Sequence, residues 1–128
     1  MRSFKRSILR AAIVSVAMLA GAGAATAAGA LAVGACGAYG QAFGYRTLDG
    51  AQNSALQKCK ATGCRVVATL QRSCAALAVD PGNPCGAHGA GQASRLGVAQ
   101  NDALRQCYRG GGKDCVIRTF VCDGRDKG

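Results

Sequence analysis

The chain has 128 residues, with sixteen Lys and Arg against six acidic residues and a net charge of +10 at pH 7. This length fits one small domain. The chain has no Trp and no Glu, so Asp is the only acid and the core must be built mainly from Ala, Val and Leu. A small domain with so thin a core usually needs covalent staples.

The first 27 residues have the order of a secretory signal peptide. Residues 1–10 carry four basic residues and no acid, residues 11–20 are apolar, and small residues follow. The apolar run is too short to span a bilayer of about 30 Å. We therefore predict a signal peptide over 1–27 and export through the general secretory route to the periplasm or the medium. The mature chain then keeps twelve basic residues against six Asp, with no stable membrane span.

An internal repeat organises the remainder, a single domain over 28–128. Ala-Leu-Ala-Val occurs at 30–33 and 76–79, and Cys-Gly-Ala-x-Gly occurs at 36–40 and 85–89. Ala-Leu-x-x-Cys occurs at 55–59 and 103–107. The two copies cover about 29–74 and 75–124. In this alignment every cysteine has a counterpart: Cys36 with Cys85, Cys59 with Cys107, Cys64 with Cys115, and Cys74 with Cys122.

Each copy is predicted to form strand, strand, helix and strand. In the first copy the strands are expected at 30–33, 38–45 and 65–71, and the helix at 48–60 with Thr47 as its N-cap. In the second copy a turn at 80–84 is followed by a helix over 95–108 with Ser94 as its N-cap, and by a strand over 116–121. The fold class is therefore α+β: two strand-strand-helix-strand repeats packed about a pseudo-two-fold axis and stapled by disulfides.

Eight cysteines in the predicted mature chain indicate a disulfide framework. Two pairs are expected to be local, because each joins the last turn of a helix to the start of the next strand: Cys59–Cys64 and Cys107–Cys115. The other four cysteines have two symmetric solutions, within the copies (Cys36–Cys74 and Cys85–Cys122) or across the axis (Cys36–Cys85 and Cys74–Cys122). We favour the second solution, because equivalent points near such an axis face each other.

The motif order resembles a known bacterial secreted family. The resemblance rests on Ala-Leu-Ala-Val, a Gly-aromatic-Gly strand, the helix ending in Ala-Leu-x-x-Cys, then Gly-Cys-Arg-Val-Val and a closing Cys-Ala-Ala-Leu-Ala. In this respect the chain is similar, over about 29–122, to the family called domain of unknown function 4189. Members usually carry a Trp in the strand after the helix and acids on the helix, and both are missing here at 68–71, 119–120 and 51–58. The resemblance implies the fold and export, and it brings no established activity.

The sequence contains no recognisable catalytic constellation. The single histidine, His88, has Tyr39 as its repeat counterpart, which favours a packing or surface role. No serine after residue 27 lies in a Gly-x-Ser-x-Gly elbow, and the six Asp are spread over turns, helices and the tail. The cysteine spacings differ between the copies and include no Cys-x-x-Cys, unlike a zinc site. We therefore predict no catalytic residue, no metal and no cofactor.

Basic residues occur throughout both copies. Four of them, near the predicted C-termini of the two helices, are candidates for contact with a polyanion: Lys58, Lys60, Arg105 and Arg109. Aromatic residues of the kind that stack bases are not interleaved with them, which argues against nucleic acid as a partner. The sequence therefore predicts a non-enzymatic binding protein whose partner is a protein or an anionic envelope or host surface. The alternatives are a small secreted enzyme with an unrecognised site, which a cleft lined by Asp and His88 would favour, and a structural envelope component.

Overall fold

The computed structural model describes residues 27–124, so the predicted signal peptide up to residue 26 lies outside the described residues. Two units follow each other with the same order of elements. The first contains β1 (Ala28–Val33), the 3-10 turn η1 (Ala35–Gly37), β2 (Tyr39–Tyr45), α1 (Leu48–Lys58) and β3 (Arg65–Gln71). The second contains β4 (Cys74–Val79), β5 (His88–Ala93), α2 (Leu96–Arg109) and β6 (Val116–Cys122). The predicted α+β class, with two strand-strand-helix-strand units, is confirmed.

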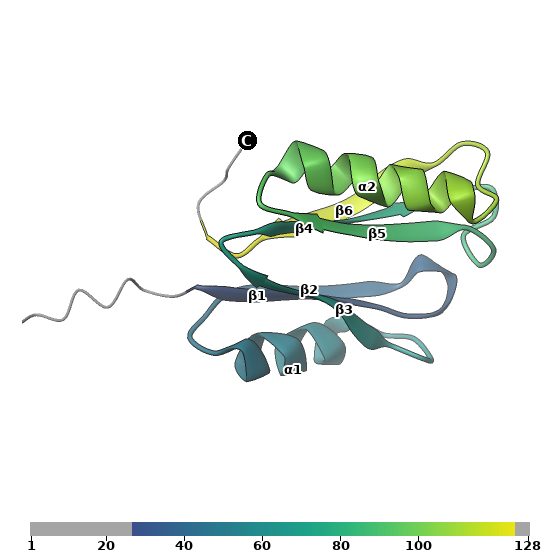
Figure 1. Ribbon diagram of the computed structural model, residues 1–128. Helices are drawn as coiled ribbons and strands as arrows, with labels where there is room; N and C mark the ends of the chain where they lie inside the picture. Colours follow the sequence, from purple (N-terminus) through teal and green to yellow (C-terminus); the bar gives the residue numbers. More distant parts are fainter. Residues whose placement is uncertain (1–26, 125–128) are drawn as a thin grey trace, which may run out of the picture.

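Each unit forms one antiparallel sheet of three strands, in the order β2-β1-β3 in the first unit and β5-β4-β6 in the second. The two sheets lie face to face, with α1 and α2 on their outer faces, so the described residues form four layers (Figure 1). Edge strands of different units meet along two lines, β2 beside β6 and β3 beside β5. We call these lines the β2/β6 seam and the β3/β5 seam. A pseudo-two-fold relation between the units predicts this pairing of edges.

The central strands alternate small and large side chains. In β1 the alanines pack towards α1, whereas Leu31 and Val33 pack into the core between the sheets. In β4 Cys74, Ala76 and Ala78 pack towards α2. The alternate residues of this strand, Ala75, Leu77 and Val79, enter that same central core. Because both faces are covered, all six residues of each strand are buried. Each large side chain in the central layer stabilises the fold by about 2 kcal/mol, and there are few of them, so the disulfides carry much of the remaining stability.

Glycines in the edge strands let the helices lie directly on the sheets. A Cβ atom at Gly40 of β2 would lie 2.0 Å from the carbonyl oxygen of Ala55 in α1. At Gly89 of β5 it would lie 2.4 Å from the carbonyl oxygen of Ala103 in α2. Both distances are far inside van der Waals contact, so the close helix–sheet approach that the small helix faces predict requires glycine at these two positions.

The helix boundaries correct two predictions. Thr47 is the N-cap of α1, and its Oγ1 accepts a hydrogen bond of 3.0 Å from the amide of Gly50, as predicted. The predicted Ser94 cap of α2 is wrong: the N-cap is Arg95, which makes no side-chain capping bond. The predicted end of the first helix at Lys60 is also too late, because α1 ends at Lys58.

Four disulfides join all eight cysteines: Cys36–Cys85, Cys59–Cys64, Cys74–Cys122 and Cys107–Cys115. The two local bridges are those expected from the repeat, with Cα–Cα separations of 6.1 and 6.2 Å. The other two follow the favoured solution. Such bridges form in oxidising compartments, so the disulfides place the protein outside the cytoplasm.

The reason given for the Cys74–Cys122 bridge is nevertheless wrong. Cys74 is the first residue of β4 and pairs in register with Cys122 of β6, so this bridge lies within the second sheet. The corresponding register pair of the first sheet is Ala28 with Gln71. Cys74 is therefore the structural counterpart of Ala28 and not of Cys122. Of the two long bridges, only Cys36–Cys85 connects equivalent positions of the two units.

Candidate functional site

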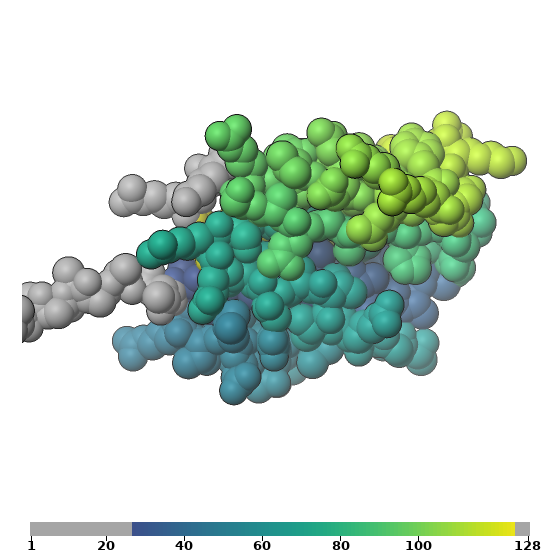
Figure 2. Space-filling model, viewed as in Figure 1, coloured from purple at the N-terminus to yellow at the C-terminus, as the bar shows by residue number. Residues whose placement is uncertain are grey.

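A groove opens at the β3/β5 seam, and we call it the seam groove. It has a volume of about 710 Å³. Figure 2 shows this side of the molecule, where the teal residues of the first unit and the green residues of the second meet. The lining comes from the end of β1, the start of β3 and the glycine loop before it, the start of β5 and the last turn of α2: Val33, Gly34, Gly63, Arg65, Val66, Val67, His88, Gly89, Ala90 and Gln106.

Strand register directs two polar side chains to this groove. Arg65 pairs with Val33, and His88 pairs with Val79. Directly opposed residues of antiparallel strands have their side chains on the same face. Val33 and Val79 belong to the core between the sheets, so Arg65 and His88 project from the inner faces of their sheets. Both lie at sheet edges and are exposed.

The β2/β6 seam has the same backbone arrangement but is closed by longer side chains. The guanidinium of Arg118 lies 5.9 Å from the ring centroid of Tyr39, a cation–π contact across the seam. Thr119 Oγ1 and Gln41 Oε1 are hydrogen-bonded at 2.7 Å across the same line. The Nζ of Lys58 reaches over the edge of β2 and donates to the carbonyl of Gln41 at 3.2 Å.

The equivalent positions of the β3/β5 seam carry shorter side chains. By strand register, His88 of the second unit is the counterpart of Tyr39 in the first, and Ala90 is the counterpart of Gln41. The bulged residue Val67 corresponds to Arg118, and Gln106 on α2 corresponds to Lys58 on α1. The seam closes only farther along. There, Gln92 Nε2 donates to the carbonyl of Thr69 at 2.7 Å.

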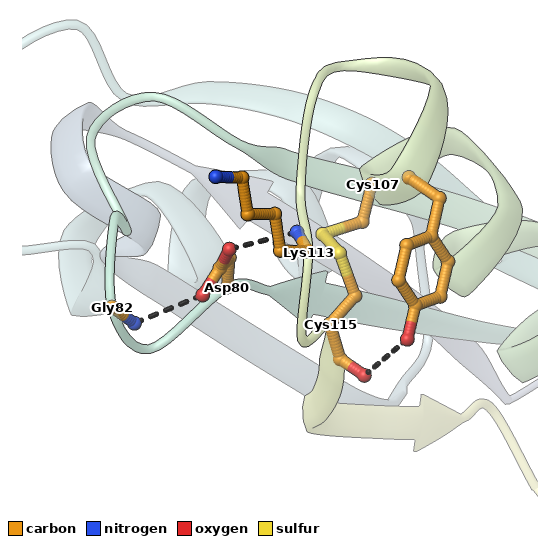
Figure 3. Close-up of a disulfide and its surroundings, with 6 residues drawn as sticks. Asp80, Gly82, Cys107, Lys113 and Cys115 are labelled. Carbon is orange, nitrogen blue, oxygen red and sulfur yellow. Dashed lines mark hydrogen bonds between the residues drawn. A yellow bond between two sulfur atoms is a disulfide. The ribbon is translucent and has the colours of Figure 1, made fainter.

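Two of the acids are turned inward, which makes the surface more basic than the residue counts suggest. Asp123 is buried, and its carboxylate accepts hydrogen bonds from the amides of Arg72 and Ser73. Asp80 is also buried and accepts from the amides of Lys113 and Gly82, both at 2.9 Å, beside the Cys107–Cys115 bridge (Figure 3).

Hydrogen bonds from these amides, that of Lys113 first, hold the pKa of Asp80 below its usual value. The predicted turn at 80–84 is confirmed and begins with Asp80. Asp123 directly follows β6 and is buried against Arg72 and Ser73. No acidic residue is among those that line the seam groove.

The four predicted polyanion contacts do not form one surface. Both helices end at the same end of the molecule, but α1 and α2 lie on opposite outer layers (Figure 1). Lys58 and Lys60 are therefore separated from Arg105 and Arg109 by two sheets. Arg105 also lies 3.9 Å from Asp102.

The sequence-based selection missed Arg65, the cation that lines the groove. The signal that could have found it is the repeat itself. Val67, Ala90 and Gln106 are all shorter than their counterparts, which indicates an open seam beside Arg65.

Within residues 27–124 no group of His, Cys and Asp is arranged to hold a metal ion. None of the helices in that range is long and apolar enough to cross a membrane. His88 is exposed at the groove, and no carboxylate is among its neighbours in the lining. The groove can therefore offer guanidinium, imidazole and amide donors to a ligand.

These features define a class of protein: a four-layer α+β sandwich of two repeated units, held by disulfides, with a basic groove where the units meet. The chain belongs to the family described as a domain of unknown function (DUF4189), whose model matches residues 28–122. No curated protein and no solved structure matches the chain.

Proposed function

We propose that this chain is an exported, non-enzymatic binding protein whose seam groove receives an anionic group of its partner. One observation carries the proposal: the fold provides two equivalent seams, and the one left open is lined by Arg65 and His88 with no acid among the lining residues. The partner's group is a carboxylate, phosphate or sulfate, borne by a protein or by an envelope or host surface.

The chemistry of the lining fits an anion. An Arg guanidinium presents several N–H donors in a planar fork that matches the oxygens of such groups. Gln106 adds an amide, and Gly63 leaves the approach to the main chain open, since no atom lies within 4 Å of the position that its Cβ would take. An Arg–anion hydrogen bond of this kind contributes about 1.5 to 3 kcal/mol to binding.

The groove gives less support to the alternative of a small enzyme. Hydrolytic chemistry at His88 needs a nucleophile or a carboxylate within hydrogen-bond reach. The residues around His88 in the groove are Arg65, Gln106, Ala90, three valines and three glycines. A binding role uses these groups as they stand.

Export through the general secretory route is part of the same proposal. The basic, apolar and small segments of residues 1–27 support a signal peptide. Cleavage after Ala27 would leave Ala28 as the first residue, and β1 begins there. The cut would therefore release the folded part with every described strand, helix and disulfide intact.

The test is a titration of the chain from Ala28 to Gly128 with a heparin tetrasaccharide, followed by backbone amide NMR. We expect shifts at Arg65, His88 and Gln106, and a Kd at least about tenfold weaker in Arg65→Ala. The matched control is Arg46→Ala. It removes the same charge from an exposed bend before α1 and should change the Kd by less than about twofold.

Equal losses of affinity in Arg65→Ala and Arg46→Ala would show diffuse charge attraction and would overturn the proposal that the groove is the binding site. Shifts confined to the helix surfaces at Lys58 or Arg109 would do the same. If the protein turned over a substrate, and His88→Tyr abolished this activity without changing the melting temperature, the enzyme alternative would replace the proposal.

A further inference from the structure

The β2/β6 seam ends in an exposed apolar surface on the side away from the seam groove. Phe43 of β2 is 64% exposed and Phe120 of β6 is 51% exposed. Both line a shallow pocket of about 300 Å³ together with Gln41, Val121, Cys122 and Gly124. We call this surface the Phe43/Phe120 patch.

The fold does not require aromatic residues at these two positions. The register pair Ala76–Phe120 of the second sheet corresponds to Ala30–Thr69 of the first, so Thr69 is the counterpart of Phe120. Gln92 is likewise the counterpart of Phe43 along β5. At the other seam, the side chain of Gln92 donates a hydrogen bond to the main-chain carbonyl of Thr69 instead. The two phenylalanines therefore expose apolar surface that the backbone arrangement does not require.

Cations flank the patch along the same seam. The Nζ of Lys58 lies 3.2 Å from the carbonyl oxygen of Gln41, which lines the pocket. Arg118, two residues before Phe120 on β6, lies over the ring of Tyr39. The nearest acid along β6, Asp123, is buried with its carboxylate on the amides of Arg72 and Ser73. The patch therefore combines exposed Phe side chains with flanking positive charge.

We propose that the Phe43/Phe120 patch docks onto an anionic lipid bilayer. The two Phe side chains enter the boundary between headgroups and acyl chains, while Lys58 and Arg118 meet the anionic headgroups. Apolar burial combined with attraction to anionic lipid is the energetic basis of peripheral membrane binding. The surface lies on the other side of the sandwich from the seam groove, so it does not depend on the proposed anion site.

Area and charge both disfavour a second copy of the chain as the occupant. The two exposed Phe side chains offer about 200 to 250 Å², whereas a stable protein interface buries about 800 Å² on each partner. A two-fold contact between copies through the patch would also bring Lys58 and Arg118 of one copy towards the same cations of the other. An anionic bilayer, in contrast, can be bound through a small apolar surface, and its charge is complementary to the cations that flank the patch.

The test is cosedimentation of the chain from Ala28 to Gly128, which leaves out the apolar segment at 11–20, with vesicles of two compositions. We expect binding to phosphatidylcholine vesicles that contain about one third phosphatidylglycerol, and little binding to pure phosphatidylcholine. The double variant Phe43→Ser and Phe120→Ser should weaken binding to the anionic vesicles at least about tenfold. Lys58→Gln with Arg118→Gln should weaken it and reduce its dependence on salt.

The matched control is Val98→Ser, which removes an apolar side chain that is 48% exposed on α2, and binding should stay within about twofold of the wild type. No binding to the anionic vesicles, or an equal loss in this control, overturns the proposal. If analytical ultracentrifugation finds the wild type to be a dimer and the double Phe variant to be a monomer, the patch binds a second copy of the chain instead, and the proposal is overturned. Arg65→Ala should retain vesicle binding, which separates this proposal from the seam groove.

Discussion

The β2/β6 and β3/β5 seams are built from equivalent pairs of edge strands, but they differ in what lies between the strands. At the first seam, Tyr39, Gln41 and Arg118 meet across the line of contact. At the second, the shorter His88 and Ala90 leave a groove of about 710 Å³. The backbone of a repeat therefore fixes where a groove can form, and side-chain length at a few edge positions decides whether it does.

The central strands show the opposite behaviour. β1 and β4 share Ala-Leu-Ala-Val, and both are buried throughout because a helix covers one face and a sheet covers the other. A change of volume there creates a cavity or a clash, which costs stability directly. The edges tolerate differences that the centre does not, so the two units diverge at the seams.

The largest expected effect concerns the one long bridge that the units do not share. Removing Cys74–Cys122 with Cys74→Ala and Cys122→Ala opens a loop with a sequence separation of 48 residues. The chain-entropy model then predicts a loss of about 4 kcal/mol in the free energy of unfolding. Urea denaturation of the variant and the wild type, both oxidised, measures the difference.

The first unit provides the reciprocal experiment. Ala28 and Gln71 occupy the register positions of Cys74 and Cys122, so Ala28→Cys with Gln71→Cys should form a fifth bridge under the conditions that oxidise the native eight cysteines. The bridge should raise the free energy of unfolding by up to about 4 kcal/mol. Free thiols at 28 and 71 in the folded variant would show that the two sheets differ at this end.

A smaller effect is expected when the open seam is given the side chains of the closed one. The double variant His88→Tyr and Ala90→Gln gives the β3/β5 seam the residue types that Tyr39 and Gln41 provide at the β2/β6 seam, and it adds no charge at pH 7. The fuller groove should bind the heparin tetrasaccharide about tenfold more weakly, with little change in melting temperature. Calorimetric titration measures the Kd.

The reverse exchange, Tyr39→His with Gln41→Ala, is the control for the seam swap. It should leave binding at the seam groove unchanged while it opens the β2/β6 seam. If filling the β3/β5 seam leaves the Kd unaltered, the anion binds elsewhere, and the contrast between the seams has no functional meaning.

Elements with a strong local signal were predictable from the sequence. Thr47 caps α1 because its hydroxyl is within reach of the amide of Gly50. The strand at 65–71 and the two local bridges also follow from local pattern and spacing. In these cases neighbouring residues determine the structure, and no distant contact opposes them.

The misplaced cap of α2 shows where local reasoning fails. Arg46-Thr47 precedes α1, and Ser94-Arg95 precedes α2, so the polar cap residue stands one position earlier in the second unit. The helix nevertheless begins at Leu96, with Arg95 in the cap position. Packing of Ala99, Ala103 and Cys107 against β4 sets the register of the helix, and this packing outweighs a cap contribution of about 1 kcal/mol.

The seam groove was less accessible to prediction, because its lining converges from distant parts of the chain. Arg65 and His88 belong to different units, and only the stacking of the two sheets, which places the edge of β3 beside that of β5, brings them to the same groove. The sequence alignment of the copies also matched Cys74 with Cys122, which hid the asymmetric bridge. Strand register, which sequence similarity alone did not supply, corrects that match.

The ends of the two central strands also differ, because Asp80 after β4 stands in the place of Gly34 after β1. The first unit has a short connection there, and its Gly34 lies against the Cys59–Cys64 bridge. The second unit has the longer connection over 80–87. The carboxylate of Asp80 accepts from the amide of Gly82 within this connection and from the amide of Lys113 in the loop before Cys115, so it ties the two loops together.

Because these hydrogen bonds lower the pKa of Asp80 in the folded state, the ionised form stabilises the fold. This contribution is complete above the unfolded pKa of about 4 and is lost as the pH falls through the lower folded value.

Asp80→Asn leaves one acceptor oxygen for two amides. It should therefore lower the melting temperature by a few degrees at pH 7, with the difference shrinking in acid below about pH 4. Thermal melts of the variant across this range measure the effect, and Asp114→Asn, at an exposed position in the neighbouring loop, is the control. A difference between Asp80→Asn and the wild type that stays constant down to the lowest pH would mean that Asp80 acts through its shape and not its charge.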